Sequence, residues 1–323
     1  MKKQYLYIVI VWALFAGCGS QRIFFQQQPK VNMRSNLPSE SEAPIGSAKR
    51  EYRHSNSNWG VEYSGEQWVR NMSKPIRITE GLANRHLSVT PSHGRYYDRG
   101  KDRWKWQRPE LFCTTEDLFT QTIVIPYLIP MLENAGATVF TSRERDWQRN
   151  EVVIDNDDRT KQPQYTETNG HRTWHDAGTT GFASRRREYT NGENPFLEGT
   201  VRVARTSNRK NQSLITYKPN IPKEGRYAVY VSYATLPNSI DDAEYIVYHK
   251  GRKTVFHVNQ KMGGGTWVYL GTFAFDKGCN IYNRVVLTNR SKRRGFVTAD
   301  AVRFGGGMGN IVRGGQVSGL PRT

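Results

Sequence analysis

The stretch TVFHVNQKMGGGTWVYLGTFAF, residues 254–275, decides the fold of the C-terminal half of the chain. Apolar and polar side chains alternate over 254–258 and again over 267–275, and a period of two is typical of a β-strand with one buried face. The glycines at 263–265 lie between the two runs as a turn signal. The stretch therefore predicts two strands of an antiparallel sheet.

The same pattern extends outward in both directions from this stretch. Turn signals such as Lys250-Gly251 and Asp276-Lys277-Gly278 separate further alternating runs. Roughly six to eight short strands in about 110 residues are typical of an antiparallel β-sandwich. The other predicted strands are residues 227–233, 245–249, 284–288 and 296–304.

Residues 76–160 have a different pattern, which predicts an α/β segment. A short strand at 86–90 and another at 137–141 flank an apolar helical stretch that Thr114 or Thr115 can cap. Pro126 and Pro130 lie inside that stretch and predict a kinked or broken helix, which Gly136 closes. Strand, helix and strand at this spacing form a βαβ unit with a parallel sheet and a right-handed crossover.

The predicted fold class is multidomain: a partial, parallel-sheet α/β segment followed by an all-β antiparallel sandwich. A chain of 323 residues is long enough for roughly two domains. Residues 161–196 are polar, lack periodicity and are interpreted as a linker. Residues 19–75 are rich in Gln, Ser, Asn and Pro over most of their length, which predicts a flexible tether.

The N-terminus has the pattern of an export signal. An apolar run over 5–17 follows two lysines and is too short to span a membrane. It ends in Leu14-Phe15-Ala16-Gly17-Cys18, which is typical of a lipobox, so residues 1–18 are a predicted lipoprotein signal peptide with lipidation on Cys18. The alternative is an ordinary cleaved signal with a chance cysteine. The predicted location is outside the cytoplasm, as a membrane-anchored lipoprotein of the cell envelope, facing the periplasm or the surface.

The charge balance predicts a polyanionic partner. The chain has 47 Lys and Arg against 29 Asp and Glu, a formal net charge of +18. Such a field attracts anionic glycans, phospholipid headgroups or wall polymers. Basic runs such as Arg185-Arg186-Arg187 match no base-recognition motif, so no nucleic-acid partner is predicted. Cys113 and Cys279 lie in different predicted domains and are not expected to form a disulfide.

Two residues of the α/β segment are candidate metal ligands. His93 follows the first strand and Glu116 opens the next helix, and both positions belong to the sheet edge where α/β proteins place ligands. Imidazole and carboxylate supply two of the three protein ligands of a common catalytic zinc site, which activates water. His171 and His175 form an H-x-x-x-H pair that would share a helix face, and either is an alternative ligand.

Residues 81–158 resemble the opening of the zinc-dependent N-acetylmuramoyl-L-alanine amidases. The resemblance rests on HLSVTPSHG at 86–94, on Thr115-Glu116-Asp117-Leu118 and on LENAGATVFTSRERD at 132–146. It implies that His93 and Glu116 bind zinc and that Arg143 and Asp146 are a structural or substrate-side pair. The family's third zinc ligand and general base have no counterpart in the chain.

Residues 197–309 resemble the golvesin and xanthan-lyase carbohydrate-binding-like domain. The resemblance rests on VYVSY at 229–233, on the opening stretch at 254–275 and on VTADAVRFGGGMG at 297–309. In multidomain relatives this sandwich interrupts the amidase, which implies that residues 310–323 are a truncated continuation. Trp267 and Tyr269 are candidate glycan-stacking residues, although alternation sends about half of such rings into the core.

Three functional hypotheses follow. The first is a peptidoglycan amidase that uses zinc, with the missing groups supplied elsewhere. The second is a non-catalytic module that binds peptidoglycan or another envelope polysaccharide and is attached to the membrane by its lipid. The third is a purely structural envelope lipoprotein.

Overall fold

The computed structural model describes residues 65–306, apart from 94, 99, 102, 142–144, 147, 159–163 and 184–193. The chain divides into two units, Met1–Gly60 and Val61–Thr323, and every described residue belongs to the second. The predicted signal peptide with Cys18, most of the tether, Arg143 and residues 310–323 lie outside the described residues. Within the described part, no helix combines the length and apolar character needed to cross a membrane.

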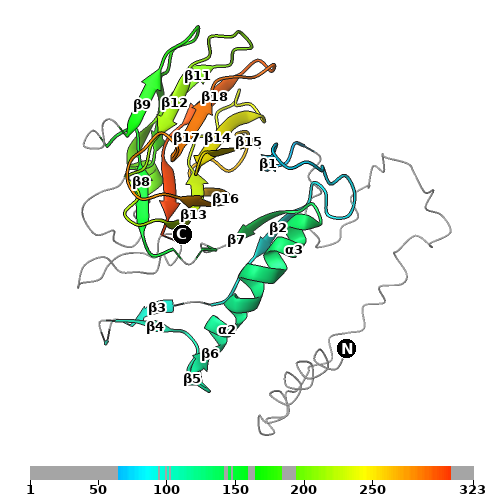
Figure 1. The fold of residues 1–323 in the computed structure, drawn as a ribbon, viewed down its shortest axis with the longest axis vertical. Helices are drawn as coiled ribbons and strands as arrows, with labels where there is room; N and C mark the ends of the chain where they lie inside the picture. The colour runs from blue at the N-terminus through cyan, green and yellow to red at the C-terminus, as the bar shows by residue number, and fades with distance from the viewer. Residues whose placement is uncertain are drawn as a thin grey trace, which may run out of the picture. The chain divides into compact units, whose positions relative to one another are not determined.

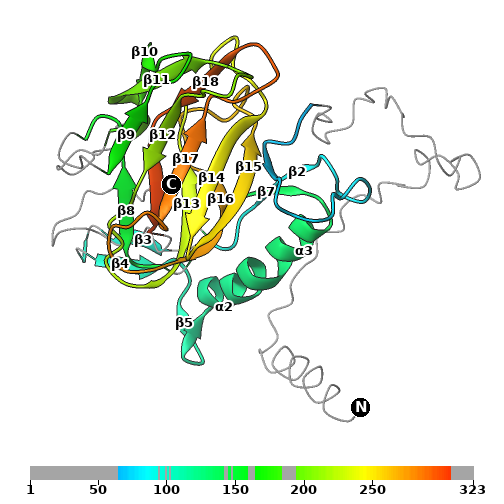
Figure 2. The same ribbon diagram turned by 45° about the horizontal axis from the view of Figure 1, so that its top comes forward.

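One layer of the predicted sandwich is a six-stranded antiparallel sheet (Figures 1 and 2). Its central strands alternate as expected, so Tyr245 and Val247 are buried while Ile246 between them is half-buried. In spatial order the strands are β1 (Val69–Asn71), β15 (Arg252–Val258), β14 (Ala243–His249), β17 (Arg284–Thr288), β12 (Leu214–Tyr217) and β9 (Tyr165–Thr168).

The opposite layer contains a four-stranded and a three-stranded sheet. One continuous apolar core joins them to the six-stranded sheet: Phe304 and Val297 of these sheets share it with Tyr245, Phe256 and Leu287. The four-stranded sheet has the order β16 (Val268–Phe275), β13 (Gly225–Val231), β19 (Val302–Gly305) and β8 (Glu151–Ile154). The three-stranded sheet has the order β10 (His175–Gly181), β11 (Gly199–Arg205) and β18 (Phe296–Ala299), and a short 3-10 helix, η4 (Pro195–Leu197), precedes β11.

The prediction of one strand over 296–304 is wrong, because the chain changes sheets within it. β18 ends at Ala299 and β19 begins at Val302 in the neighbouring sheet. Asp300 occupies the break, and its buried carboxylate accepts hydrogen bonds from the Phe182 amide at 3.0 Å and from the Ser232 hydroxyl at 2.5 Å. Phe182 follows β10 of the three-stranded sheet and Ser232 follows β13 of the four-stranded sheet, so Asp300 connects two sheets that share no ladder of backbone hydrogen bonds among the described strands.

The βαβ unit is present in the α/β segment. β2 (His86–Val89) pairs in parallel with β7 (Thr138–Thr141), with Leu87 opposite Val139. Between them the helix is divided as the two prolines predict, and the Thr115 side chain caps its start by accepting from the Leu118 amide at 3.1 Å. Gly136 follows the last helical turn with a φ of 105°. The helical pieces are α2 (Glu116–Ile123), the π-helix η2 (Val124–Leu128) and α3 (Ile129–Asn134).

Short strands that the sequence pattern did not predict precede α2. They form two antiparallel pairs, and the second pair ends at the Thr115 cap. The first pair is β3 (Arg95–Asp98) with β4 (Arg103–Trp106), and the second is β5 (Glu110–Leu111) with β6 (Thr114–Thr115).

The predicted segment boundaries need correction at three places. Residues 161–196 are not simply a linker, because β9 and β10 lie there and pair with β12 and β11. The predicted tether reaches too far, since β1 pairs with β15. β8, inside the predicted α/β segment, pairs with β19. All four are edge strands with one neighbour each, a position that fits the polar sequences of β9 and β10.

Candidate functional site

The two predicted zinc ligands follow β2 and open α2, and a neighbouring buried acid, Asp117, contacts one of them. The carboxylate of Asp117 is fully buried and accepts hydrogen bonds from the Ser92 hydroxyl at 3.0 Å and from the Arg108 amide at 2.9 Å. Its Oδ1 also lies 3.2 Å from Nδ1 of His93. Burial alone would raise the pKa of Asp117, but these hydrogen bonds outweigh it and the pKa lies below its usual value.

Glu116, unlike this buried acid, is solvent-exposed. Its Oε2 lies 3.7 Å from Nε of Arg108. Among the described residues, no three His, Cys, Asp or Glu side chains gather into a group that could hold a metal. The described residues therefore offer His93 and Glu116 but not the three protein ligands of a catalytic zinc site.

The alternative ligands His171 and His175, and Asp146 of the predicted pair, lie elsewhere. His171 is in the loop before β10, and His175 is the first residue of β10, so the two do not share a helix face. Asp146 is buried and accepts hydrogen bonds from the Tyr230 hydroxyl at 3.0 Å and the Gln148 amide at 2.9 Å. Its observed contacts are therefore structural and reach β13 of the sandwich.

A cleft of about 600 Å³ contains the two predicted glycan-stacking residues. We name it the aromatic cleft. It lies among β1, β7 and β16, so residues of the α/β segment and of the sandwich both line it. Its aromatic lining is Trp68, Phe140, Tyr230, Phe256, Trp267 and Tyr269, and its charged lining is Arg70, Lys74, Arg77, Arg145, Arg303 and Glu133.

The rings of Trp267 and Tyr269 are half-buried, and protein groups already contact them. The centroid of the Trp267 ring lies 4.8 Å from that of Phe182. The Arg303 guanidinium lies 5.3 Å from the Trp267 centroid. The Arg145 guanidinium lies 3.7 Å from the centroid of Tyr269. Both rings thus form the cleft wall, and the surface they leave to a ligand is partial.

The two arginines beside these rings were not predicted from the sequence. Arg303 is 1% exposed, and its guanidinium lies 4.4 Å from the centroid of Tyr230. The Arg145 side chain is 7% exposed and its Nη1 lies 2.6 Å from Oε1 of Glu133, while its buried Nε has no hydrogen-bond acceptor among the described residues.

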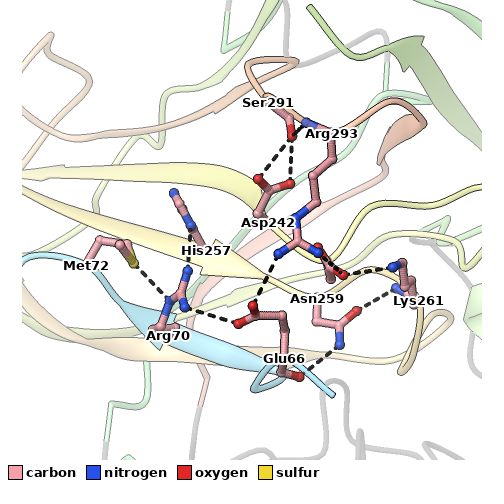
Figure 3. A network of polar contacts seen from close by, with 10 residues as sticks. Glu66, Arg70, Met72, Asp242, His257, Asn259, Lys261, Ser291 and Arg293 are labelled. Atoms are coloured by element: carbon pink, nitrogen blue, oxygen red, sulfur yellow. Dashed lines mark hydrogen bonds and ion pairs between the residues drawn. The ribbon is translucent and has the colours of Figure 1, made fainter. Parts of the chain in front are cut away.

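A network of ion pairs fixes the segment that carries β1 to the sandwich (Figure 3). Glu66 links Arg70 at 3.1 Å and Arg293 at 3.2 Å, and Arg293 continues to Asp241 at 2.7 Å. Nη2 of Arg70 also lies 3.2 Å from Nδ1 of His257, whose pKa is lowered by burial and by the Arg70 charge. Because an arginine side chain can only donate, Nδ1 of His257 accepts this hydrogen bond, which holds one wall of the aromatic cleft in place.

The strand order and the sandwich core define a β-sandwich domain, and a family model agrees. Residues 190–306 match the Golvesin C-terminal domain. The match supports the golvesin part of the predicted resemblance, while residues 81–158, for which an amidase resemblance is predicted, lie outside the matched range. The edge strands β1, β8, β9 and β10 also lie outside it, so the sandwich is larger than the matched segment.

A curated protein and several solved structures are similar to parts of this chain. A xanthan lyase of Bacillus sp. (strain GL1) is 34% identical over 97 residues, 29% of this chain and 10% of that protein. The structure of a Paenibacillus xanthan lyase is 24% identical, covering 48% of this chain and 13% of that one, with a TM-score of 0.35. The C-terminal CBM6 of LamC, a marine laminarinase from Zobellia galactanivorans, is 14% identical over 48% of this chain and 99% of that one, with a TM-score of 0.28. The chain thus spans about a tenth of the length of the curated relative it matches.

Proposed function

We propose that this protein binds carbohydrate through its β-sandwich, with the aromatic cleft as the binding site. The observation that carries the proposal is the composition of that cleft, in which partly accessible rings alternate with arginine side chains. Rings pack against the C–H faces of sugars, and planar guanidinium groups donate to their hydroxyl and carboxylate oxygens. The volume of about 600 Å³ suits a few sugar units.

Two further observations support a polysaccharide ligand. Residues 190–306 match the Golvesin C-terminal domain, and a curated relative that matches 97 residues of the chain is named a xanthan lyase, after a polysaccharide. The proposal takes from that relative the class of ligand and not the lyase activity. With the export signal and lipidated Cys18 expected at the N-terminus, the ligand we propose is peptidoglycan or another envelope polysaccharide.

Binding can be tested by affinity electrophoresis of the purified protein in gels that contain one polysaccharide each. The panel holds a neutral β-glucan, dextran, polygalacturonate and xanthan, with a sedimentation assay on peptidoglycan sacculi. We expect at least one glycan to retard the native protein and not the heat-denatured protein. Normal migration in every gel, together with no sedimentation, would overturn the proposed function.

A second candidate function is hydrolysis, with His93 and Glu116 as zinc ligands. It is favoured by the Asp117 carboxylate on Nδ1 of His93, because a carboxylate on one ring nitrogen is the usual way in which a metal-binding imidazole is oriented. Zinc bound there would polarise a carbonyl and activate water. The third ligand would come from outside the described residues.

The zinc hypothesis predicts a metal content that depends on both residues. After incubation with zinc and removal of the unbound metal, we expect the protein to retain zinc that His93→Ala and Glu116→Ala both lose. Glu110→Ala is the matched control, since Glu110 is an exposed acid just before α2. Elemental analysis gives the zinc content, and zinc at background in the unmodified protein would contradict the hypothesis for this chain.

A further inference from the structure

A second cleft, of about 680 Å³, lies wholly within the sandwich. We name it the basic cleft. Loops at the ends of strands form it: the residues before β10, the β11–β12 connection and the β17–β18 connection. None of its lining residues lines the aromatic cleft. Its cationic lining is Arg172, Arg205, Arg209, Lys292, Arg293 and Arg294.

The charge of the basic cleft is strongly one-sided. Its lining contains six Arg and Lys residues, and no Asp or Glu. Arg293 is held by Asp241 at 2.7 Å and Glu66 at 3.2 Å. No carboxylate among the described residues forms an ion pair with the other five cations. Like charges gathered in a concave surface raise the local potential and favour an anionic ligand.

Backbone hydrogen bonds hold the loops of the basic cleft in place. The Thr206 amide donates to the Gly295 carbonyl at 3.0 Å, and the Ser207 amide donates to the Asn289 carbonyl at 2.9 Å. The segment before β10 is joined to the β11–β12 connection by the His171 amide, which donates to the Asn211 carbonyl at 2.9 Å. The cations are therefore presented on an ordered frame, and less conformational entropy is lost when a ligand binds.

The lining residues other than the cations indicate which class of polyanion the basic cleft fits. The side-chain amides of Asn208 and Asn238 can bind hydroxyl groups. Phe296 is the aromatic residue of the lining, and the Arg205 guanidinium lies 5.6 Å from its ring centroid, so the cleft lacks the series of free rings on which bases stack. A concave polar site also lacks the exposed apolar side chains that enter a membrane interface.

We propose that the basic cleft binds the acidic groups of an anionic polysaccharide and is a second glycan site, separate from the aromatic cleft. The inference rests on the proposed carbohydrate-binding function and deepens it by naming the class of ligand. Carboxylate, sulfate and phosphate substituents share the chemistry that the cations recognise.

The test compares a triple variant with a control of equal charge. Arg209→Gln, Lys292→Gln and Arg294→Gln together remove three exposed cations of the basic cleft, whereas Arg252→Gln, Lys253→Gln and Lys277→Gln remove three exposed cations elsewhere on the sandwich. Affinity for polygalacturonate is measured at ~0.1 M salt. We expect the cleft variant to bind about tenfold more weakly and the control variant to bind within about twofold of the unmodified protein.

The outcomes separate this inference from the proposed function. Equal losses of affinity for polygalacturonate in both triple variants would overturn the inference that the basic cleft is a glycan site. If the protein still bound a neutral glycan through the aromatic cleft, the proposed function would stand. Tighter binding to duplex DNA or to anionic phosphatidylglycerol vesicles than to polygalacturonate, lost in the cleft variant, would also overturn the inference. No binding to any glycan would overturn both proposals.

Discussion

Replacing Asp300 with alanine is expected to lower the free energy of unfolding by about 3 kcal/mol at pH 5. The Asp300 carboxylate is 1% exposed, and it accepts hydrogen bonds from the Phe182 amide and the Ser232 hydroxyl. The substitution leaves both donors buried without an acceptor, at the point where β18 passes into β19. Chemical denaturation of the variant and of the unmodified protein measures the difference.

The pH dependence of this difference is a second part of the same prediction. Burial raises the pKa of Asp300 well above its usual value. Since the folded pKa then exceeds the unfolded value of about 3.9, the contribution of this carboxyl is present at low pH and is lost as pH rises through the folded pKa. The gap between the two proteins should therefore narrow toward alkaline pH.

Asp276→Ala is the matched control for this substitution. Asp276 lies in the turn after β16, and its exposed carboxylate pairs with Lys250 at 3.3 Å, so its loss should change the free energy of unfolding by less than about 1 kcal/mol. Equal effects of the two substitutions would show that Asp300 does not hold the sheet break together.

Replacing Tyr269 with alanine is expected to weaken polysaccharide binding about tenfold, which corresponds to ~1.4 kcal/mol. The variant removes a ring of the aromatic cleft and the surface against which the Arg145 guanidinium is held. Isothermal titration calorimetry with the glycan that retards the protein in gels gives the affinity.

The Tyr248→Ala variant controls for the loss of an arginine-stacked tyrosine. Tyr248 lies on β14, half-buried, with the Arg284 guanidinium 3.8 Å from its ring centroid, and it does not line the aromatic cleft. We expect its affinity to stay within about twofold of the unmodified protein. An affinity unchanged in Tyr269→Ala, or reduced equally in both variants, would place the glycan elsewhere.

A strand could be predicted from the sequence where one of its faces is buried and the other is not. β14 and β15 are central strands of a sheet, so one face of each is apolar and the period of two is visible in the sequence. β9 and β10 have a single neighbour each and carry polar residues, which is why residues 161–196 looked like a linker. β13 does not alternate between buried and exposed residues, since its last five residues are all buried. Tyr230, which faces away from the core, is covered by Asp146 and Arg303.

The candidate sites were less predictable than the fold, because they depend on contacts between distant segments. The sequence pattern placed His93 and Glu116 at one edge, yet it could not show that Asp117 is the buried acid that contacts His93. Trp267 and Tyr269 are predictable as aromatic residues of a strand. The roles of Arg145 and Arg303 needed the folded chain, since nothing local distinguishes a buried arginine from a solvated one.

The central claim, that carbohydrate binds in the aromatic cleft, is tested most directly by the NMR signals of the tryptophan indole N–H groups. Trp68 and Trp267 line the cleft, whereas Trp174 is buried in the sandwich core and serves as an internal reference. Each signal is assigned by a Trp→Phe variant, and the glycan is then titrated into the unmodified protein. We predict that the Trp68 and Trp267 signals shift together with saturation of binding while the Trp174 signal stays in place. Saturable binding with the Trp68 and Trp267 signals unmoved would contradict the account.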